Sequence, residues 1–227
     1  MAKAKMFSNA FAKITGSLSS ASSSASSLAD GPTGDAAKQP APTPNALSTD
    51  TNSKMQTMIG GEATAVGEST SASGEVTTRT FDKGAVKISF GSAEFTAAAK
   101  TTGGDPTYAA ADSYASASGA DIFLTRTKVS SYNGQEALQT YSGETSRTVY
   151  LAIDIEKVDL PRGPITVDKT IEKGDPPTAL PSDGNLAILD VDAKAEAEHT
   201  YIGTDASALS MEDSLSTVSA IVITEVA

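Results

Sequence analysis

Apolar and polar residues alternate along most of the chain, from about Met58 to the C-terminus. The clearest stretch runs from Leu189 to Tyr201, where small and apolar residues, with one histidine, occupy the odd positions and polar or charged residues occupy the even ones. Alanine, glutamate and lysine favour helices, but a helix would scatter these alanines around its circumference, whereas a strand places them on one face. The alternation therefore predicts a strand over 189–201.

The same alternation predicts several further strands. In 149–155 the apolar residues are at odd positions, whereas Val158 and Leu160 have the other parity, which indicates a bulge near Glu156 and Lys157. Other segments with strand-like alternation or apolar runs are 86–97, 121–129, 165–171 and 218–226. Strands of this number and spacing are typical of an all-β domain.

Two of these strands carry additional information. In 86–97 the apolar residues change parity after Phe90, which predicts a tight bend at Gly91 and Ser92. In 218–226 the segment from Ala220 to Ile223 is apolar on both parities, which indicates a strand in the interior of a sheet.

Turn-forming residues separate the predicted strands, and no long helical pattern is present; Met211 to Leu215 predicts at most one helical turn. The turn signals are Asp82-Lys83-Gly84, Gly103-Gly104-Asp105-Pro106, Tyr132-Asn133-Gly134, Pro161-Arg162-Gly163-Pro164, Gly174-Asp175-Pro176-Pro177 and Asp183-Gly184-Asn185. We therefore expect an antiparallel β-sandwich or a jelly-roll-like domain over 58–227.

The N-terminal part has a different composition. From about Gly16 to Ser53 the chain is rich in serine, alanine and proline, and such residues bury too little apolar area to offset the entropy of ordering. This predicts a disordered arm over 1–57. Within it, Phe7, Phe11, Ile14 and Leu18 have helical spacing, which predicts either a short amphipathic docking helix near 6–18 or a nascent helix in a disordered tail.

Charge and hydropathy exclude some partners. Acidic residues number 28 and basic residues 17, so the net charge is −11, and such a surface repels nucleic-acid phosphates and anionic lipid headgroups. No stretch approaches the roughly 20 apolar residues of a membrane helix. Lys3 and Lys5 are not followed by the apolar core of a classical signal peptide. We expect no nucleic-acid binding and no membrane insertion.

The residues that usually carry catalysis are scarce. His199 is the only histidine, and the chain has no cysteine and no tryptophan. Phosphate-binding loops, dinucleotide fingerprints and nucleophile-elbow motifs are also missing from the sequence. The alternation places His199 on an apolar strand face beside Tyr201, which is typical of a hydrogen-bonded core or edge histidine. The sequence thus predicts a protein that is not an enzyme and holds no organic cofactor.

Carboxylates are the only chemical groups that cluster. Asp154 and Glu156 lie near the end of one predicted strand, and Asp190 and Asp192 lie on the polar face of another. Calcium prefers several oxygen ligands, including carboxylates at alternate positions. If the two strands were neighbours, these four residues could bind one calcium ion; a solvated polar face is the alternative interpretation.

Two short segments resemble known bacterial exported proteins. Ala63 to Gly67 with Ser71 to Gly74 resembles part of a head repeat of trimeric autotransporter adhesins, but it occurs once, where a stacked roll needs about three repeats. The C-terminal segment from Val218 to Ala227 is similar to ends read by bacterial type I secretion. These resemblances imply a secreted or cell-surface location, whereas a buried C-terminal strand accounts equally well for the second segment.

Together, these features predict a structural or surface protein that self-assembles or adheres, in an extracellular matrix, a filament or at a cell surface. Faces of alanine, serine and threonine allow sheets to approach closely, which favours self-association by sheet stacking or strand addition. One alternative is a viral or phage coat, decoration or spike subunit, located in the virion. Another is a calcium-binding secreted protein.

Overall fold

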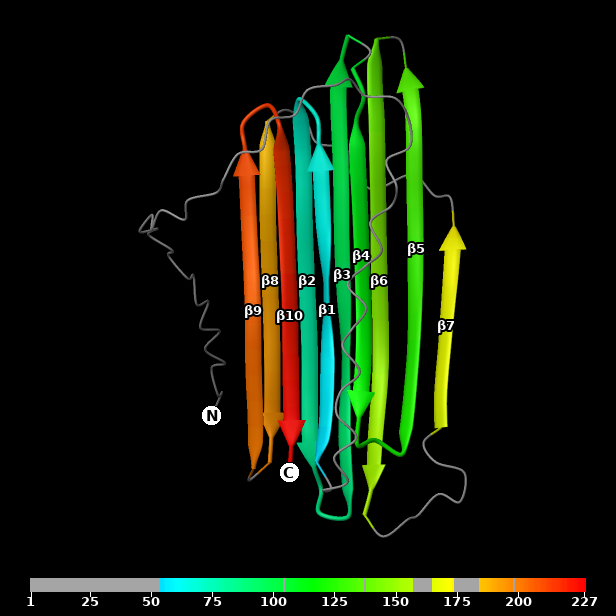
Figure 1. Ribbon diagram of the computed structural model, residues 1–227, viewed down its shortest axis with the longest axis vertical. Helices are drawn as coiled ribbons and strands as arrows, with labels where there is room; N and C mark the ends of the chain where they lie inside the picture. The colour runs from blue at the N-terminus through cyan, green and yellow to red at the C-terminus, as the bar shows by residue number, and fades with distance from the viewer. Residues whose placement is uncertain (1–53, 104, 137, 157–164, 174–183, 198) are drawn as a thin grey trace, which may run out of the picture. The chain divides into compact units, whose positions relative to one another are not determined.

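The computed structural model describes residues 54–227 except 104, 137, 157–164, 174–183 and 198. No residue in this part is helical, and ten strands form two packed sheets (Figure 1), which confirms the predicted all-β sandwich. The strands are β1 (Met55–Val66), β2 (Ser69–Asp82), β3 (Val86–Thr102), β4 (Tyr108–Ser118), β5 (Ile122–Glu136), β6 (Gln139–Ile155), β7 (Ile165–Lys173), β8 (Asn185–Glu196), β9 (Thr200–Met211) and β10 (Leu215–Val226). β1 begins slightly before the domain boundary predicted at residue 58.

Some of the predicted features lie outside the described residues. These are the N-terminal arm with its helix near 6–18, Lys157 with the remainder of the predicted bulge, and the turns at 161–164 and 174–177.

The two sheets differ in size and in strand direction. The smaller has the order β4-β1-β10-β9 and is antiparallel throughout. The larger has the order β7-β5-β6-β3-β2-β8, with antiparallel pairs in the interior and a parallel pair at each edge. β10 has a neighbour on each side, which confirms the prediction that Ala220 to Ile223 lie inside a sheet.

The four-stranded sheet covers only part of the six-stranded one. β4 packs against β6, β1 against β3, β10 against β2, and β9 against β8. Figure 1 shows β5 and β7 extending beyond this covered part. The six-stranded sheet therefore has one face that is only partly covered, and a second face that points away from the four-stranded sheet.

The sandwich core is built mainly from small residues around one large ring. Phe95 is completely buried. A Cβ atom on Gly61 would lie 2.5 Å from the Phe95 ring, and one on Gly74 would lie 2.6 Å from it. Because real Cβ atoms do not approach so closely, the two glycines are required for the sheets to close around this ring.

Hydroxyl groups fill another part of the core. Side chains from both sheets form one buried hydrogen-bonded network, with oxygen–oxygen distances of 2.6 to 3.2 Å. Its members are Thr57, Thr78, Thr80, Ser89, Tyr150 and Thr224. Buried hydroxyls are costly unless they are hydrogen-bonded, so the network accounts for a core that is rich in serine and threonine.

Several predicted turns are confirmed and others are wrong. Gly84 has a φ of +77° and its N–H donates to Asp82 Oδ1 at 2.7 Å, which forms the predicted β2–β3 turn. The predicted turn at 132–134 is wrong, because these residues belong to β5. The predicted helical turn at 211–215 is also wrong: a tight connection joins β9 to β10, with Asp213 at a φ of 52°.

The predicted bend at Gly91 and Ser92 is wrong as well. β3 runs straight through both residues, and its odd positions point into the sandwich along the whole strand. The apparent change of phase has another cause: near the start of β3, the apolar residues are on the outside.

Candidate interaction surface

The six-stranded sheet has an outward face, by which we mean the side chains that point away from the four-stranded sheet. β3 shows the alternation clearly, since Lys87 and Ser89 are buried between the sheets while Ile88 and Phe90 point outward. Ser89 is 0% exposed and Phe90 is 41% exposed. At this end of β3, polar residues lie in the core and apolar ones on the surface, the reverse of the usual order.

Apolar residues of neighbouring strands align in two rows across the outward face, and we call them the apolar band. They are Phe81, Ile88, Ile153, Ile122 and Ile165 in the first row, and Phe90, Leu151, Leu124 and Val167 in the second. Residues directly opposite each other on one face of a sheet are in contact. The first row of the band is apolar across β2, β3, β6, β5 and β7. In the second row β2 contributes Arg79, so that row is apolar only from β3 to β7.

The band is most exposed at the β7 edge. Ile165 and Val167 are each 51% exposed, and Leu124 on the next strand is 38% exposed. On the other side, the rings of Phe81 and Phe90 stack with their centroids 5.9 Å apart. Large apolar surfaces that remain open in a soluble protein mark contact sites.

The next two rows of the outward face carry opposite charges on its two halves. The acidic half lies on β8, β2 and β3 and consists of Asp190, Asp192, Glu75 and Glu94. The basic half lies on β6, β5 and β7 and consists of Arg147, Arg126, Lys128 and Lys169. We call these two rows the charged band. It lies directly beside the apolar band.

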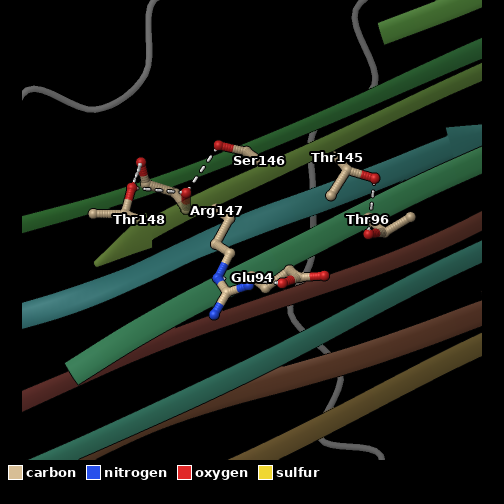
Figure 2. A network of polar contacts seen from close by, with 7 residues as sticks. Glu94, Thr96, Thr145, Ser146, Arg147 and Thr148 are labelled. Atoms are coloured by element: carbon tan, nitrogen blue, oxygen red, sulfur yellow. Dashed lines mark hydrogen bonds and ion pairs between the residues drawn. The ribbon is translucent and has the colours of Figure 1, made fainter. Parts of the chain in front are cut away.

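The acidic and basic halves meet at the centre of the sheet. Arg147 Nε lies 3.5 Å from Glu94 Oε2, and both side chains are exposed (Figure 2). On the opposite side of the same strand, Ser146 and Thr148 point into the sandwich, where each hydroxyl lies 2.8 Å from that of Ser113. A single strand thus presents charge outward and bonded hydroxyls inward.

The four candidate calcium ligands are not brought together. Asp154 belongs to β6 and points inward, whereas Asp190 and Asp192 lie on the outward face of β8. Glu156 follows the end of β6, and β3 and β2 separate β6 from β8. Within the described residues, no three histidine or carboxylate side chains are arranged to hold a metal ion.

Asp154 instead faces a buried lysine. Lys87 Nζ lies 3.7 Å from Asp154 Oδ2, and the lysine side chain is 3% exposed. Burial raises the pKa of the Asp154 carboxyl above its ordinary value; the Lys87 ammonium opposes this shift, and the Asp121 and Glu156 carboxylates add to it. The Lys87–Asp154 pair lies on the inner face of the six-stranded sheet, at the same end of β3 and β6 as the apolar band on the outward face.

His199 lies outside any strand. β8 ends at Glu196 and β9 begins at Thr200, so the predicted single strand over 189–201 is wrong beyond its first part. The chain crosses here from the six-stranded to the four-stranded sheet. The His199 side chain is exposed rather than in the core, and its backbone carbonyl accepts a hydrogen bond from the Ala227 N–H at 3.0 Å.

Comparison of the chain with protein-family models, with curated proteins and with solved structures finds no match. The fold and the outward face therefore define its class by themselves: an acidic all-β sandwich with an apolar band and a charged band on its larger sheet.

Proposed function

We propose that the protein is a non-enzymatic structural subunit that self-associates through its larger sheet. The observation that carries this proposal is the apolar band, which the four-stranded sheet does not cover. Burying such a band contributes about 25 cal/mol for each Å² of apolar surface removed from water. A second layer over this face would bury the apolar side chains that the isolated sandwich leaves exposed to water.

Sheet stacking is supported more strongly than strand addition. Strand addition would use the edge strands of the larger sheet, β7 and β8, each paired on one side among the described strands. Those edges offer backbone hydrogen bonds to any extended chain. The outward face offers apolar and charged groups in a fixed pattern, which recognises a particular partner.

The proposal places the subunit in an extracellular matrix, a filament or a cell surface. A calcium-binding role receives no support from the positions of Asp154 and Asp190, which lie on opposite faces of the sheet. The same building block would also suit a virus or phage particle, and gene neighbourhood separates these locations. Genes for a secretion ATPase favour the first location, and genes for a terminase or portal favour the virion.

Sedimentation velocity of the full-length protein tests self-association. We expect the weight-average sedimentation coefficient to rise with concentration from low to high micromolar in about 0.15 M salt. The series is repeated with millimolar calcium and at seawater-like salt. A single monomer boundary at high micromolar concentration under all of these conditions would exclude the proposed function.

A further inference from the structure

The outward face is complementary to itself when one copy is turned over onto another. Consider a twofold axis in the plane of the interface, parallel to the strands and passing between β3 and β6, the central strands of the larger sheet. Such an axis keeps each residue row at its own height and exchanges the two sides of the sheet. β3 then faces β6 of the second copy, β2 faces β5, and β8 faces β7.

This arrangement places the apolar band on itself. In the first row, Ile88 faces Ile153 of the second copy and Phe81 faces Ile122; in the second row, Phe90 faces Leu151. Arg79 faces Leu124, where its methylene stem covers apolar surface and its charge reaches the solvent. The central part of both apolar rows is thereby removed from water, while Ile165 and Val167 at the β7 edge face Glu196 and Lys194 of the second copy.

The charged band is matched at the same time. In the row that contains Glu75, this residue faces Lys128 of the second copy, and Glu94 faces Arg147. In the adjoining row, Asp192 faces Lys169. Every contact occurs twice because the interface is symmetric, so three of the four acids of each copy face a cation of the other.

Charge distinguishes this axis from the alternative one. A twofold axis perpendicular to the strands would place β2 on β2 and β5 on β5. If this axis crossed the row of Glu75, Glu75 would approach another Glu75 and Lys128 another Lys128. If it crossed the apolar band instead, the charged band would face the end of the second copy's sheet and its charges would find no partners. Like charges brought together at an interface cost several kcal/mol, so the charged band selects the axis parallel to the strands.

The isolated sheet also carries repulsion among acidic residues, which the Glu94–Arg147 ion pair relieves only at one end of the row and which this partner would reduce further. Asp190, Glu75 and Glu94 lie directly opposite one another on three neighbouring strands. Like charges directly opposite in a sheet are destabilising. Within the described residues, Glu75 and Lys128 form no ion pair. Cations over this row offset the repulsion, and a second copy supplies two of them, Arg147 over Glu94 and Lys128 over Glu75, while Asp190 faces Ile171.

The size of the face is sufficient for a specific contact. Six strands at about 4.8 Å and four rows at about 6.8 Å cover roughly 780 Å² on each copy. Specific interfaces bury about 800 Å² per partner. The aligned packing of two such twisted sheets, about 30° apart, is the common geometry of stacked sheets.

We infer that two copies associate back to back through the apolar and charged bands, related by a twofold axis parallel to the strands between β3 and β6. The inference rests on the proposed function and specifies its partner and its geometry. It predicts that charge reversals at Glu75 and Lys128 compensate for each other between copies.

The test uses Glu75→Lys and Lys128→Glu, each made in the full chain. Alone, each variant places two like-charged pairs in its own dimer, and we expect its dissociation constant to rise about 100-fold or more above that of the wild type. Mixed in equal amounts, the variants form a heterodimer in which both pairs are opposite charges. Its affinity should return to within about tenfold of the wild type. Sedimentation equilibrium with one variant fluorescently labelled measures both values.

Glu62→Lys is the matched control, because Glu62 is exposed on the outward face of the four-stranded sheet. It makes the same change in net charge as Glu75→Lys and should leave association unchanged. A monomeric wild type would refute the proposed function itself. A wild type that associates while both variants associate equally well, or while the mixture gains nothing, would overturn this interface and leave self-assembly standing.

Discussion

The two faces of the six-stranded sheet differ most where β3 and β5 begin. On the inner face, this region holds Thr80, Ser89 and Lys87, all buried. On the outward face, it holds Ile88 and Phe90 on the same strand, together with the other residues of the apolar band. Here the hydroxyl groups are sealed inside while isoleucine, leucine and phenylalanine face outward.

This difference explains how a small-residue core and an apolar surface occur together. Hydroxyl side chains satisfy one another across the two sheets, which lets the sheets approach closely without large side chains between them. The large apolar residues are thereby free to serve a contact outside the sandwich. In the proposed assembly, the inner face stabilises the single copy and the outward face provides the affinity between copies.

Two phenylalanines on β3 make this comparison directly testable. Phe95→Ala removes the buried ring between Gly61 and Gly74, and we expect the free energy of unfolding to fall by about 3–5 kcal/mol. Phe90→Ala removes an outward ring and should cost the monomer only about 1 kcal/mol. Urea denaturation at low micromolar concentration measures both values.

Association should rank these two variants in the opposite order. Phe90→Ala is expected to weaken self-association about tenfold or more, because it truncates an apolar contact near the twofold axis. Phe95→Ala should leave association of the folded fraction unchanged. Equal losses of stability in the two variants would remove the distinction between the faces.

The hydroxyl network makes a smaller contribution that can be isolated. Tyr150→Phe removes the hydroxyl that lies 2.6 Å from Thr78 Oγ1 and 2.8 Å from Ser89 Oγ. Leaving Thr78 without this partner should lower the free energy of unfolding by about 1–2 kcal/mol. Tyr132→Phe is the control, since Tyr132 is exposed. Denaturation curves that coincide for Tyr150→Phe and the wild type would contradict a stabilising network.

The smallest expected effect concerns pH. Burial raises the pKa of Asp154 above 3.8, so the folded protein binds this proton more tightly than the unfolded chain does. The wild type therefore loses stability relative to Asp154→Asn as pH rises from about 4 through the raised pKa, and the difference then levels off. We expect a change below about 1 kcal/mol, because solvent screens the site. Denaturation at a series of pH values measures it; a wild type that gains stability relative to Asp154→Asn as pH rises would contradict the shift.

Period-two alternation was sufficient to predict the all-β class and the positions of six of the ten described strands; β1, β2, β4 and β9 were not predicted. It worked for β10, where apolar residues on both parities are typical of an interior strand and where β1 and β9 flank the strand. It failed at His199, where polar–apolar alternation continues although the chain crosses between sheets. Local alternation does not record which sheet a strand joins, so the crossover has no sequence signal.

Alternation also does not record which face is inside. The segment 149–155 has apolar residues at its odd positions, yet Tyr150 and Ala152 are the buried ones. A signal for this was present at the start of β3, where Ile88 and Phe90 alternate with two polar residues. Of these, Ser89 bonds across the core to Thr57, and Lys87 pairs with Asp154 on the neighbouring strand. The outward face could be identified only after register aligned such residues from five strands.

A distance across the interface tests the central claim most directly. The chain has no cysteine, so Ser73→Cys introduces a single spin-label site on β2, just beyond the charged band. Three strand spacings sideways and one sheet spacing across place the two labels of a dimer about 18 Å apart. Ser219→Cys on the outward face of the four-stranded sheet is the control, with its labels about 30 Å apart or more. Pulsed dipolar measurements on the dimer should give the short distance for Ser73→Cys alone; a short distance for Ser219→Cys, or none for Ser73→Cys, would contradict back-to-back pairing.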